Sequence, residues 1–155
     1  MAGSRHSAGL LMFRRREQLQ VLLAHPGGPY WARRDAGAWT LPKGEVGDGE
    51  DLLAAACREF REETGFTPAA PYLPLGELTQ KGGKRVTAWA FEAEADPAQL
   101  VCNRFEIEWP PRSGQMRSFA EIDRADWFNL QQAQLKILPA QLPFLSRLAA
   151  LMIAP

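Results

Sequence analysis

Hydrophobic and polar positions divide the chain into short strand-like runs and a few helical stretches. Apolar residues dominate 8–13 and 19–24, with the charged segment 14–18 between them, which predicts a β-hairpin. Apolar and polar positions alternate over residues 85–93, and this segment follows the apolar run 75–79 after a glycine-rich turn. The pattern therefore predicts a second hairpin.

Three shorter extended segments are expected at residues 39–41, 105–109 and 125–129. Two helical stretches follow at 131–137 and 142–152, separated by proline-containing sequence. Strands before and after one central helix, with helices at the end, predict an α/β fold in which helices cover a mixed sheet.

The central helix is expected over residues 50–64. Acidic residues, among them Asp48 and Asp51, gather where the alanine-rich stretch begins, and a helix N-terminus favours negative charge. Gly65 follows Thr64 at the position where helices commonly end. This segment proves to contain the main chemical signal of the sequence.

Size and composition narrow the class of protein. The 155 residues, 46% of them hydrophobic and 23% charged, are typical of one globular domain and argue against disorder, so we expect a single domain over residues 1–155. Lysine plus arginine and aspartate plus glutamate number 18 each. Without an overall basic field, we expect neither nucleic acid nor a membrane as the main partner.

The few cysteines and histidines limit the possible metals. Cys57 and Cys102 have neither the number nor the spacing of a disulfide framework, and we expect reduced thiols in a cytoplasmic protein. With only His6 and His25 available, a metal would have to be held by carboxylate and carbonyl oxygens, which favours Mg²⁺ or Mn²⁺. The apolar run at 10–13 is too short for a signal sequence or a membrane span.

One spaced pattern runs from the loop before the central helix to the end of that helix. Three of its acids, Glu59, Glu62 and Glu63, follow the spacing i, i+3, i+4 and so fall within an arc of about 100° on a helix. Clustered carboxylates repel one another unless cations neutralise them, and Mg²⁺ commonly bridges such carboxylates to phosphates. The fixed positions of the pattern are Gly44, Glu50, Arg58, Glu59, Glu62, Glu63 and Gly65.

This pattern closely resembles the box of the Nudix hydrolase family, and every fixed position is filled. The resemblance implies an α/β/α sandwich with a mixed sheet and the box as loop, helix and loop. It also implies Mg²⁺-dependent hydrolysis of a nucleoside diphosphate linked to another group. The three glutamates taken alone would also fit a solvated helix face, but the complete pattern favours a metal site.

The family's residue roles can be carried over position by position. Glu62 and Glu63 would bind metal, and Glu59 would bind metal or act as the base. Lys43 would offer its backbone carbonyl to the metal, since it precedes the box glycine. Arg58 can pair with Glu62 or Glu50 and orient the acidic cluster.

A further carboxylate from outside the box is also expected by resemblance. Glu121 precedes the Trp127-Phe128 pair in a segment similar to the late part of the family's sequences. We favour Glu121, and Glu106 or Glu108 is the competing source.

The flanking sequence suggests a substrate. The segment 39–44 resembles the lead-in of the branch that includes dinucleoside polyphosphate hydrolases and diphosphoinositol polyphosphate hydrolases. Over nearly its whole length, the chain is similar to predicted bacterial nucleotide pyrophosphohydrolases of the family. Lys81 and Lys84 lie on a glycine-rich loop similar to that branch's lysine-bearing loop, and with Lys43 they could contact a phosphate chain. The two loop lysines would equally suit an ordinary basic hairpin tip.

Two departures weaken the dinucleotide assignment. Glu45 replaces the histidine usual in dinucleoside tetraphosphate hydrolases, and the tyrosine that stacks a base there aligns with Ala125. A base could instead stack on one of several aromatic side chains. These are Tyr30, Trp31, Phe119 and Trp109.

Three functional hypotheses remain. The favoured one is hydrolysis of a nucleoside polyphosphate, preferably a dinucleoside polyphosphate, by a monomer or homodimer. The second is cleavage of nucleoside triphosphates, oxidised nucleotides or nucleotide sugars. The third is a non-catalytic nucleotide-binding module, which the complete set of box glutamates disfavours.

Overall fold

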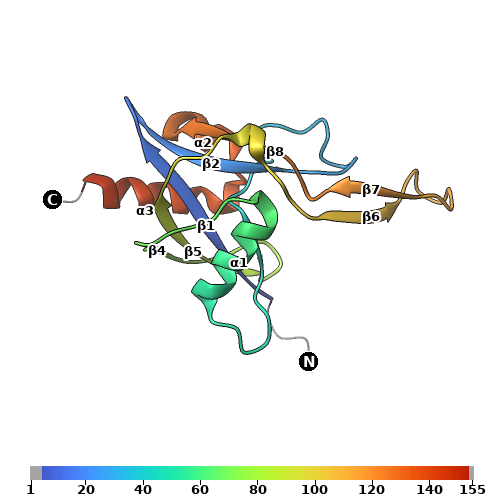
Figure 1. The fold of residues 1–155 in the computed structure, drawn as a ribbon, viewed down its shortest axis with the longest axis horizontal. Helices are drawn as coiled ribbons and strands as arrows, with labels where there is room; N and C mark the ends of the chain where they lie inside the picture. The colour runs from blue at the N-terminus through green and yellow to red at the C-terminus, as the bar shows by residue number, and fades with distance from the viewer. Residues whose placement is uncertain (1–4, 154–155) are drawn as a thin grey trace.

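The computed structural model describes residues 5–153, in which a mixed sheet is covered by helices on both faces. The main sheet has the order β4-β5-β1-β2-β8, with β3 paired to β1 (Figure 1). Strands β1 and β5 are parallel, and the other neighbouring pairs are antiparallel. The main-sheet strands are β1 (His6–Arg15), β2 (Leu19–Pro26), β3 (Lys43–Glu45), β4 (Leu73–Thr79), β5 (Arg85–Glu92) and β8 (Ile122–Asn129).

One face of the sheet is covered by helix α1 (Leu52–Thr64). Leu10 and Met12 of β1 pack there with Ala56 and Phe60 of α1. Burying a side chain such as Phe60 contributes about 1.5–3 kcal/mol to the free energy of unfolding.

The opposite face is covered by α2 (Leu130–Lys136) and α3 (Leu142–Ile153), with short 3₁₀ turns η1 (Pro97–Gln99) and η2 (Pro139–Gln141) in the connections. Leu11 of β1 packs there with Phe144 of α3. Neighbouring residues of β1 thus point to opposite layers, as strand geometry requires. The α/β/α sandwich with a mixed sheet is confirmed.

Strands β1 and β2 separate beyond their hairpin, and the chain before the box fills the gap. Their pairing covers only Phe13 to Arg15 of β1. Beyond it, Thr40 exchanges backbone hydrogen bonds with Ala24 of β2 at 2.8 and 2.9 Å, and β3 pairs with the start of β1. The open strand pair therefore holds the box loop beside α1.

Most element predictions agree with the structure within a few residues. The predicted extended segment 39–41 forms isolated bridges rather than a strand, and strand β3 follows it at Lys43–Glu45. Two other elements differ at their starts. Helix α1 begins at Leu52 rather than at residue 50, because Asp51 is its N-cap and accepts the Ala54 N–H at 3.0 Å. Strand β8 begins at Ile122, three residues before the predicted segment 125–129.

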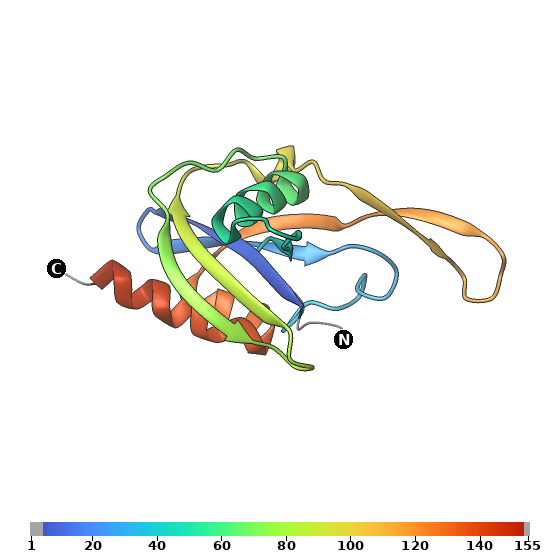
Figure 2. The same ribbon diagram turned by 90° about the horizontal axis from the view of Figure 1, so that it is seen from below.

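The predicted strand at 105–109 is half of a separate hairpin. Strands β6 (Arg104–Glu108) and β7 (Met116–Ala120) form a two-stranded sheet that extends away from the sandwich (Figures 1 and 2). We call this hairpin the arm. Strand β7 was not predicted, because two polar residues, Arg117 and Ser118, stand side by side in it and interrupt the alternation typical of a strand.

Over residues 5–153, none of the helices has the length and apolar character needed to span a bilayer.

Candidate active site

The box loop lies directly against the helix that carries the acidic residues. The backbone N–H of Lys43 donates to Glu63 Oε2 at 3.0 Å. Gly44 lies so close to Glu59 that a Cβ atom there would be 2.0 Å from the Glu59 carboxyl carbon. The glycine of the pattern is therefore explained by contact with a site carboxylate.

Arg58 joins the acids of the box into one network. Its Nε and Nη2 donate to both oxygens of Glu50 at 2.8 and 2.9 Å, a bidentate pair. Its Nη1 donates to Glu59 at 2.8 Å and to Glu62 at 3.2 Å. The sequence allowed either Glu62 or Glu50 as the partner of Arg58, and in the structure Arg58 contacts both.

Glu50 lies before the helix and is fixed from two sides. It accepts the Gly47 N–H at 2.9 Å as well as the Arg58 guanidinium. The guanidinium, and then the Gly47 hydrogen bond, lower the pKa of Glu50 to about 2. Glu50 is thus a permanent anion that holds Arg58.

Glu63 and Glu59 are the two carboxylates in less favourable surroundings. Burial is the main cause that raises the pKa of Glu63 to about 8, and the charges of Glu59 and Glu121 raise it further. Hydrogen bonding from the Lys43 backbone and the Lys43 charge act against this rise. Burial also raises the pKa of Glu59, against the effect of Arg58. Like charges gathered at a buried position create a demand for a cation.

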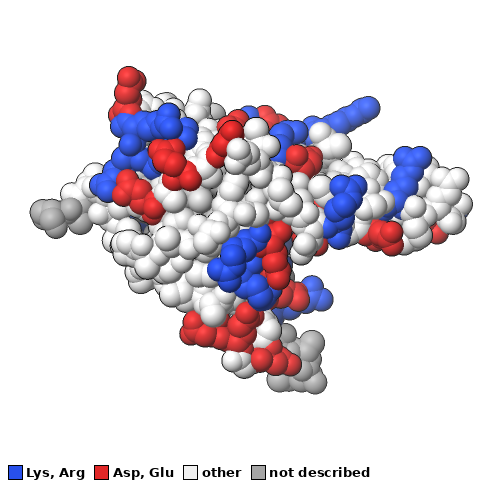
Figure 3. Space-filling model, viewed as in Figure 1, with Lys and Arg blue, Asp and Glu red and all other residues white. Residues whose placement is uncertain are grey.

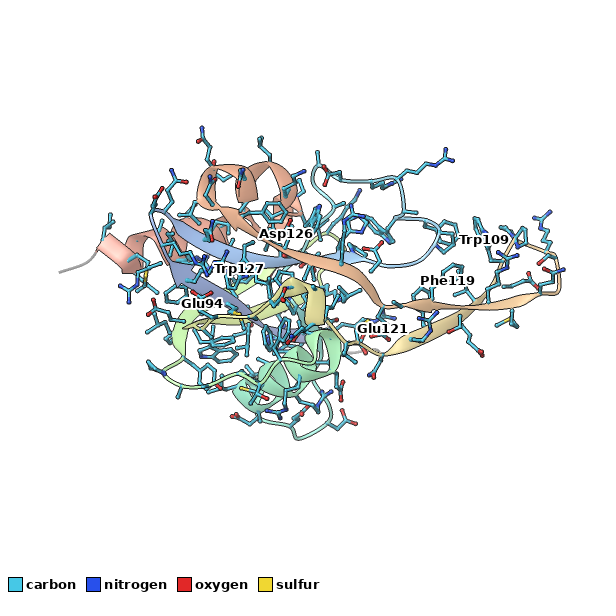
Figure 4. All side chains as sticks on the ribbon, turned by 45° about the horizontal axis from the view of Figure 1, so that its top comes forward. Glu94, Trp109, Phe119, Glu121, Asp126 and Trp127 are labelled. Carbon is cyan, nitrogen blue, oxygen red and sulfur yellow. The ribbon has the colours of Figure 1, made fainter. Side chains whose placement is uncertain are left out.

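Glu121 reaches this cluster from the turn between β7 and β8. Its charge acts on both Glu59 and Glu63, and Figure 4 shows it at the base of the arm beside α1. All three acids are exposed, but the competing two lie farther along the arm, and Glu108 accepts the Arg112 N–H at 2.8 Å. Of the three acids, Glu121 has the surroundings expected of an additional ligand.

Two of the predicted phosphate-binding lysines lie near the box. Burial, and next the positive charge of Lys84, lower the pKa of Lys43, while Glu63 and Glu59 act against this. Lys84 directly precedes β5 and is half-buried, whereas Lys81 is exposed at the tip of the β4–β5 hairpin. A pair of neighbouring ammonium groups is a site for an anion.

The two aromatic residues predicted to bind substrate differ in their surroundings. Tyr30 is 63% exposed, and its ring meets the Trp109 ring edge to face with centroids 5.3 Å apart. Trp31 packs against the core on the α2 and α3 side, with the Arg34 guanidinium 5.4 Å from its ring. Tyr30 is thus the more accessible of the two.

The donor set has the chemistry of a site for Mg²⁺ or Mn²⁺, since it consists of carboxylate and carbonyl oxygens. Among residues 5–153, no three His, Cys, Asp or Glu side chains converge closely enough to hold an ion in this arrangement. Here the single positive charge of Arg58 is shared among Glu50, Glu59 and Glu62. Glu63 accepts the Lys43 backbone N–H and lies near the charges of Glu59 and Glu121, so this all-oxygen donor set fits a divalent cation.

Sequence reasoning missed a buried network beside the site. His25 is fully buried, with Nδ1 2.8 Å from Asp123 Oδ1 and Nε2 2.6 Å from the Arg34 carbonyl oxygen. It links the end of β2, the loop at 27–36 and the start of β8, next to Glu121. Its position after an apolar strand was the only sequence signal.

An open hollow of about 780 Å³ lies away from the box, around Asp126 and Trp127 of β8 and Glu94 (Figure 4). Arg14 stacks 4.2 Å from the Trp127 ring and donates to Glu94 at 3.0 Å. Both arginines that line this hollow, Arg14 and Arg16, already pair with Glu94, so the carboxylate cluster remains the candidate site.

Comparison with known proteins agrees with the box. The family model described as NUDIX domain matches residues 3–148. The chain belongs to the Nudix family. Opposite charges are distributed as this membership suggests: Figure 3 shows acidic and basic side chains side by side around α1.

Among curated Nudix relatives, an RNA pyrophosphohydrolase of Rhizobium meliloti is 29% identical over 65% of this chain and 64% of its own length. An 8-oxo-(d)GTP phosphatase of Mycolicibacterium smegmatis is 47% identical over 34% of this chain and 17% of its own. The chain thus spans less than two thirds of these relatives. The structure of a C. elegans Ap4A hydrolase covers 94% of this chain and 97% of its own, with a TM-score of 0.67 and 23% identity, and shares the fold.

Proposed function

We propose that the protein hydrolyses a phosphoanhydride bond of a nucleoside polyphosphate, with Mg²⁺ or Mn²⁺ as cofactor. The observation that carries the proposal is the half-buried carboxylate of Glu63, which accepts the Lys43 backbone N–H and lies near the charges of Glu59, Glu121 and the Lys43 ammonium group. Such a site needs acidic side chains that hold a cation and, beside them, basic side chains that bind a phosphate.

Each residue has a role in this proposal. Glu62 and Glu63 hold the divalent cation, Glu59 holds it or accepts a proton from the attacking water, and Glu121 adds a carboxylate. The Lys43 carbonyl is the remaining oxygen donor. The bound cation would neutralise the anhydride and lower the pKa of a water molecule.

Arg58 and Glu50 act as the positioning pair. The bidentate contact with Glu50 keeps the guanidinium at one end of the acidic cluster. Arg58 then limits the rotamers of Glu59 and Glu62, which it also contacts. Ligands restrained in this way lose less conformational freedom on binding.

The preferred substrate in this proposal is a dinucleoside polyphosphate. Lys43 and Lys84 form a pair of neighbouring positive charges, and Lys81 at the hairpin tip extends the basic surface along the same loop. A long phosphate chain can use all three. The fold shared with the C. elegans Ap4A hydrolase supports this preference.

A second candidate is removal of pyrophosphate from a substrate with one triphosphate, such as an oxidised nucleotide or the 5′ end of an RNA. The names of the Mycolicibacterium and Rhizobium relatives favour it. A non-catalytic nucleotide-binding role is the third, and the complete box argues against it.

A substrate panel with product identification tests the proposal. Diadenosine tetraphosphate, nucleoside triphosphates, 8-oxo-dGTP, nucleotide sugars and a 5′-triphosphorylated RNA are each incubated with Mg²⁺ or Mn²⁺. We expect hydrolysis that stops in EDTA and in Glu62→Gln. Glu17→Gln, the same substitution at an exposed turn far from the box, is the matched control and stays active. Full activity of Glu62→Gln would overturn the proposed metal-binding role of Glu62. A wild-type protein that is inactive on every substrate would overturn the proposed enzymatic activity.

A further inference from the structure

The arm presents aromatic side chains along one face. Strand residues alternate between faces, so Phe105, Ile107 and Trp109 share a side. Phe119 pairs with Phe105 in the register and joins the same side, with ring centroids 6.0 Å apart. These side chains are half-buried, while the residues between them on β6 are exposed.

The loop at residues 27–31 packs against this side of the arm. A Cβ atom on Gly28 would be 2.8 Å from Phe105 Cζ, so the loop backbone lies directly on that ring. Farther out, the edge-to-face contact of Tyr30 with Trp109 has an interplanar angle of 79°. An edge-to-face pair leaves ring faces free for a further ring. We call Tyr30, Phe105, Trp109 and Phe119 the aromatic face; Figure 4 labels two of them, Trp109 and Phe119, along the arm.

The base of the arm is joined to the candidate active site by backbone hydrogen bonds. The Asn103 N–H donates to the Glu62 carbonyl at 3.3 Å, and the Glu121 N–H donates to the Asn103 carbonyl at 3.0 Å. Gly27 N–H donates to the Glu121 carbonyl at 2.8 Å. The loop, the arm and the proposed metal ligands thus form one connected structure.

The outer end of the aromatic face is far from the carboxylates. Trp109 is four residues beyond Phe105, and Glu121 is two residues beyond Phe119, the partner of Phe105. At about 3.3 Å per residue, the path along the strands from Glu121 to Trp109 is about 20 Å. A base stacked at Trp109 would therefore lie at the outer end of the aromatic face, with the phosphate chain between it and the box.

We propose that the outer part of the aromatic face, at Tyr30 and Trp109, stacks the second base of a dinucleoside polyphosphate whose phosphate chain lies at the box. This inference rests on the proposed function and assigns the binding site for the second base of its preferred substrate. Aromatic side chains stack bases of any identity, and a cation on the same side favours the phosphates of the ligand. Arg117 supplies that cation, because it pairs with Ile107 in the register.

Calorimetric binding without turnover tests the inference. Diadenosine tetraphosphate, ATP and inorganic tripolyphosphate are titrated into wild-type, Trp109→Ala and Tyr30→Ala proteins in EDTA and again with Ca²⁺. We expect each substitution to raise the Kd for diadenosine tetraphosphate by about tenfold or more, which is the usual cost of losing one base stack. The Kd values for ATP and tripolyphosphate should be unchanged. Trp109→Phe keeps a ring and should restore most of the affinity.

Met116→Ala is the matched control, since Met116 is 62% exposed and pairs with Glu108, on the opposite face of the arm. The proposal is overturned if wild type fails to bind diadenosine tetraphosphate under both conditions, or if both alanine variants bind it as wild type does. The proposal is also overturned if the variants lose as much affinity for tripolyphosphate, or if they lose affinity only for a 5′-triphosphorylated RNA oligonucleotide. Because binding is measured without hydrolysis, an inactive but base-binding protein would contradict only the proposed reaction.

Discussion

Gly44 and Glu59 occupy a space that admits no side chain between them. The distance of 2.0 Å from a Cβ on residue 44 to the Glu59 carboxyl carbon is far below any van der Waals contact. We predict that Gly44→Ala forces Glu59 out of position and lowers kcat about 100-fold, since a misplacement of about 1 Å can cost that much. Initial rates at saturating Mg²⁺ and substrate give kcat for the variant and the wild type.

Gly47→Ala is the control for this substitution. A Cβ there would meet Glu50 Oε1 at 3.4 Å, an ordinary contact, and the N–H that donates to Glu50 is retained. Near-normal activity is expected. If Gly44→Ala is equally active, close packing at Gly44 does not matter for Glu59.

The half-buried carboxyl group of Glu63 should make the stability of the protein depend on pH. Its pKa of about 8 in the folded protein lies above the ordinary value of 4.5, so the protonated form is favoured by folding. Its stabilisation is fully present below about pH 4.5 and is lost as the pH rises through about 8. In EDTA, urea unfolding should therefore show a falling free energy of unfolding between pH 5 and pH 8.

Glu63→Gln is the comparison variant, because its amide does not ionise. The fall in the free energy of unfolding over this pH range should be smaller than in wild type. Added Mg²⁺ should raise the wild-type Tm more at pH 8 than at pH 6, since the cation binds the ionised form. Identical pH dependence in both proteins would contradict the account of Glu63.

Glu50 is predicted to act on the metal through Arg58. In Glu50→Gln the guanidinium loses its anionic partner and retains Glu59 and Glu62, the proposed ligands. We expect the Kd for Mn²⁺, measured by electron paramagnetic resonance, to rise about tenfold, as is usual when a group that orients ligands is lost. An unchanged Kd would show that Glu50 holds only the loop.

His25 is predicted to matter for stability. Replacing it with alanine removes a fully buried ring with two hydrogen-bond contacts, one to Asp123 and one to the Arg34 carbonyl. We expect the free energy of unfolding to fall by about 2–4 kcal/mol, the range for losing a buried hydrogen-bonded side chain. His6→Ala, at a partly exposed position, should cost less. Equal losses would mean that the His25 network contributes nothing special.

The box could be predicted from the sequence because the features that define it lie close together along the chain. The spacing of Glu59, Glu62 and Glu63 needs only helix geometry, and Asp51 and Gly65 mark the ends of that helix. The contact of Gly44 with Glu59 lies beyond local pattern, because it depends on how the box loop meets the helix in space.

The arm and the surroundings of His25 were not predictable in this way. Pro110 and Pro111 follow the strand that starts near Phe105, and the adjacent polar residues Arg117 and Ser118 interrupt the alternation that would indicate a returning strand. His25 meets Asp123 across 98 positions of sequence. Such contacts follow from the order of strands in the sheet, which no periodicity encodes.

The central claim is that box carboxylates hold a divalent cation for anhydride hydrolysis. Its most direct test is the single-turnover rate of diadenosine tetraphosphate hydrolysis with Mg²⁺ for wild type and Glu63→Gln, with folding of both checked by circular dichroism. The account predicts a rate at least about 100-fold lower in the variant, because loss of a ligand removes metal-based stabilisation of the transition state. Equal rates in the two folded proteins would contradict it.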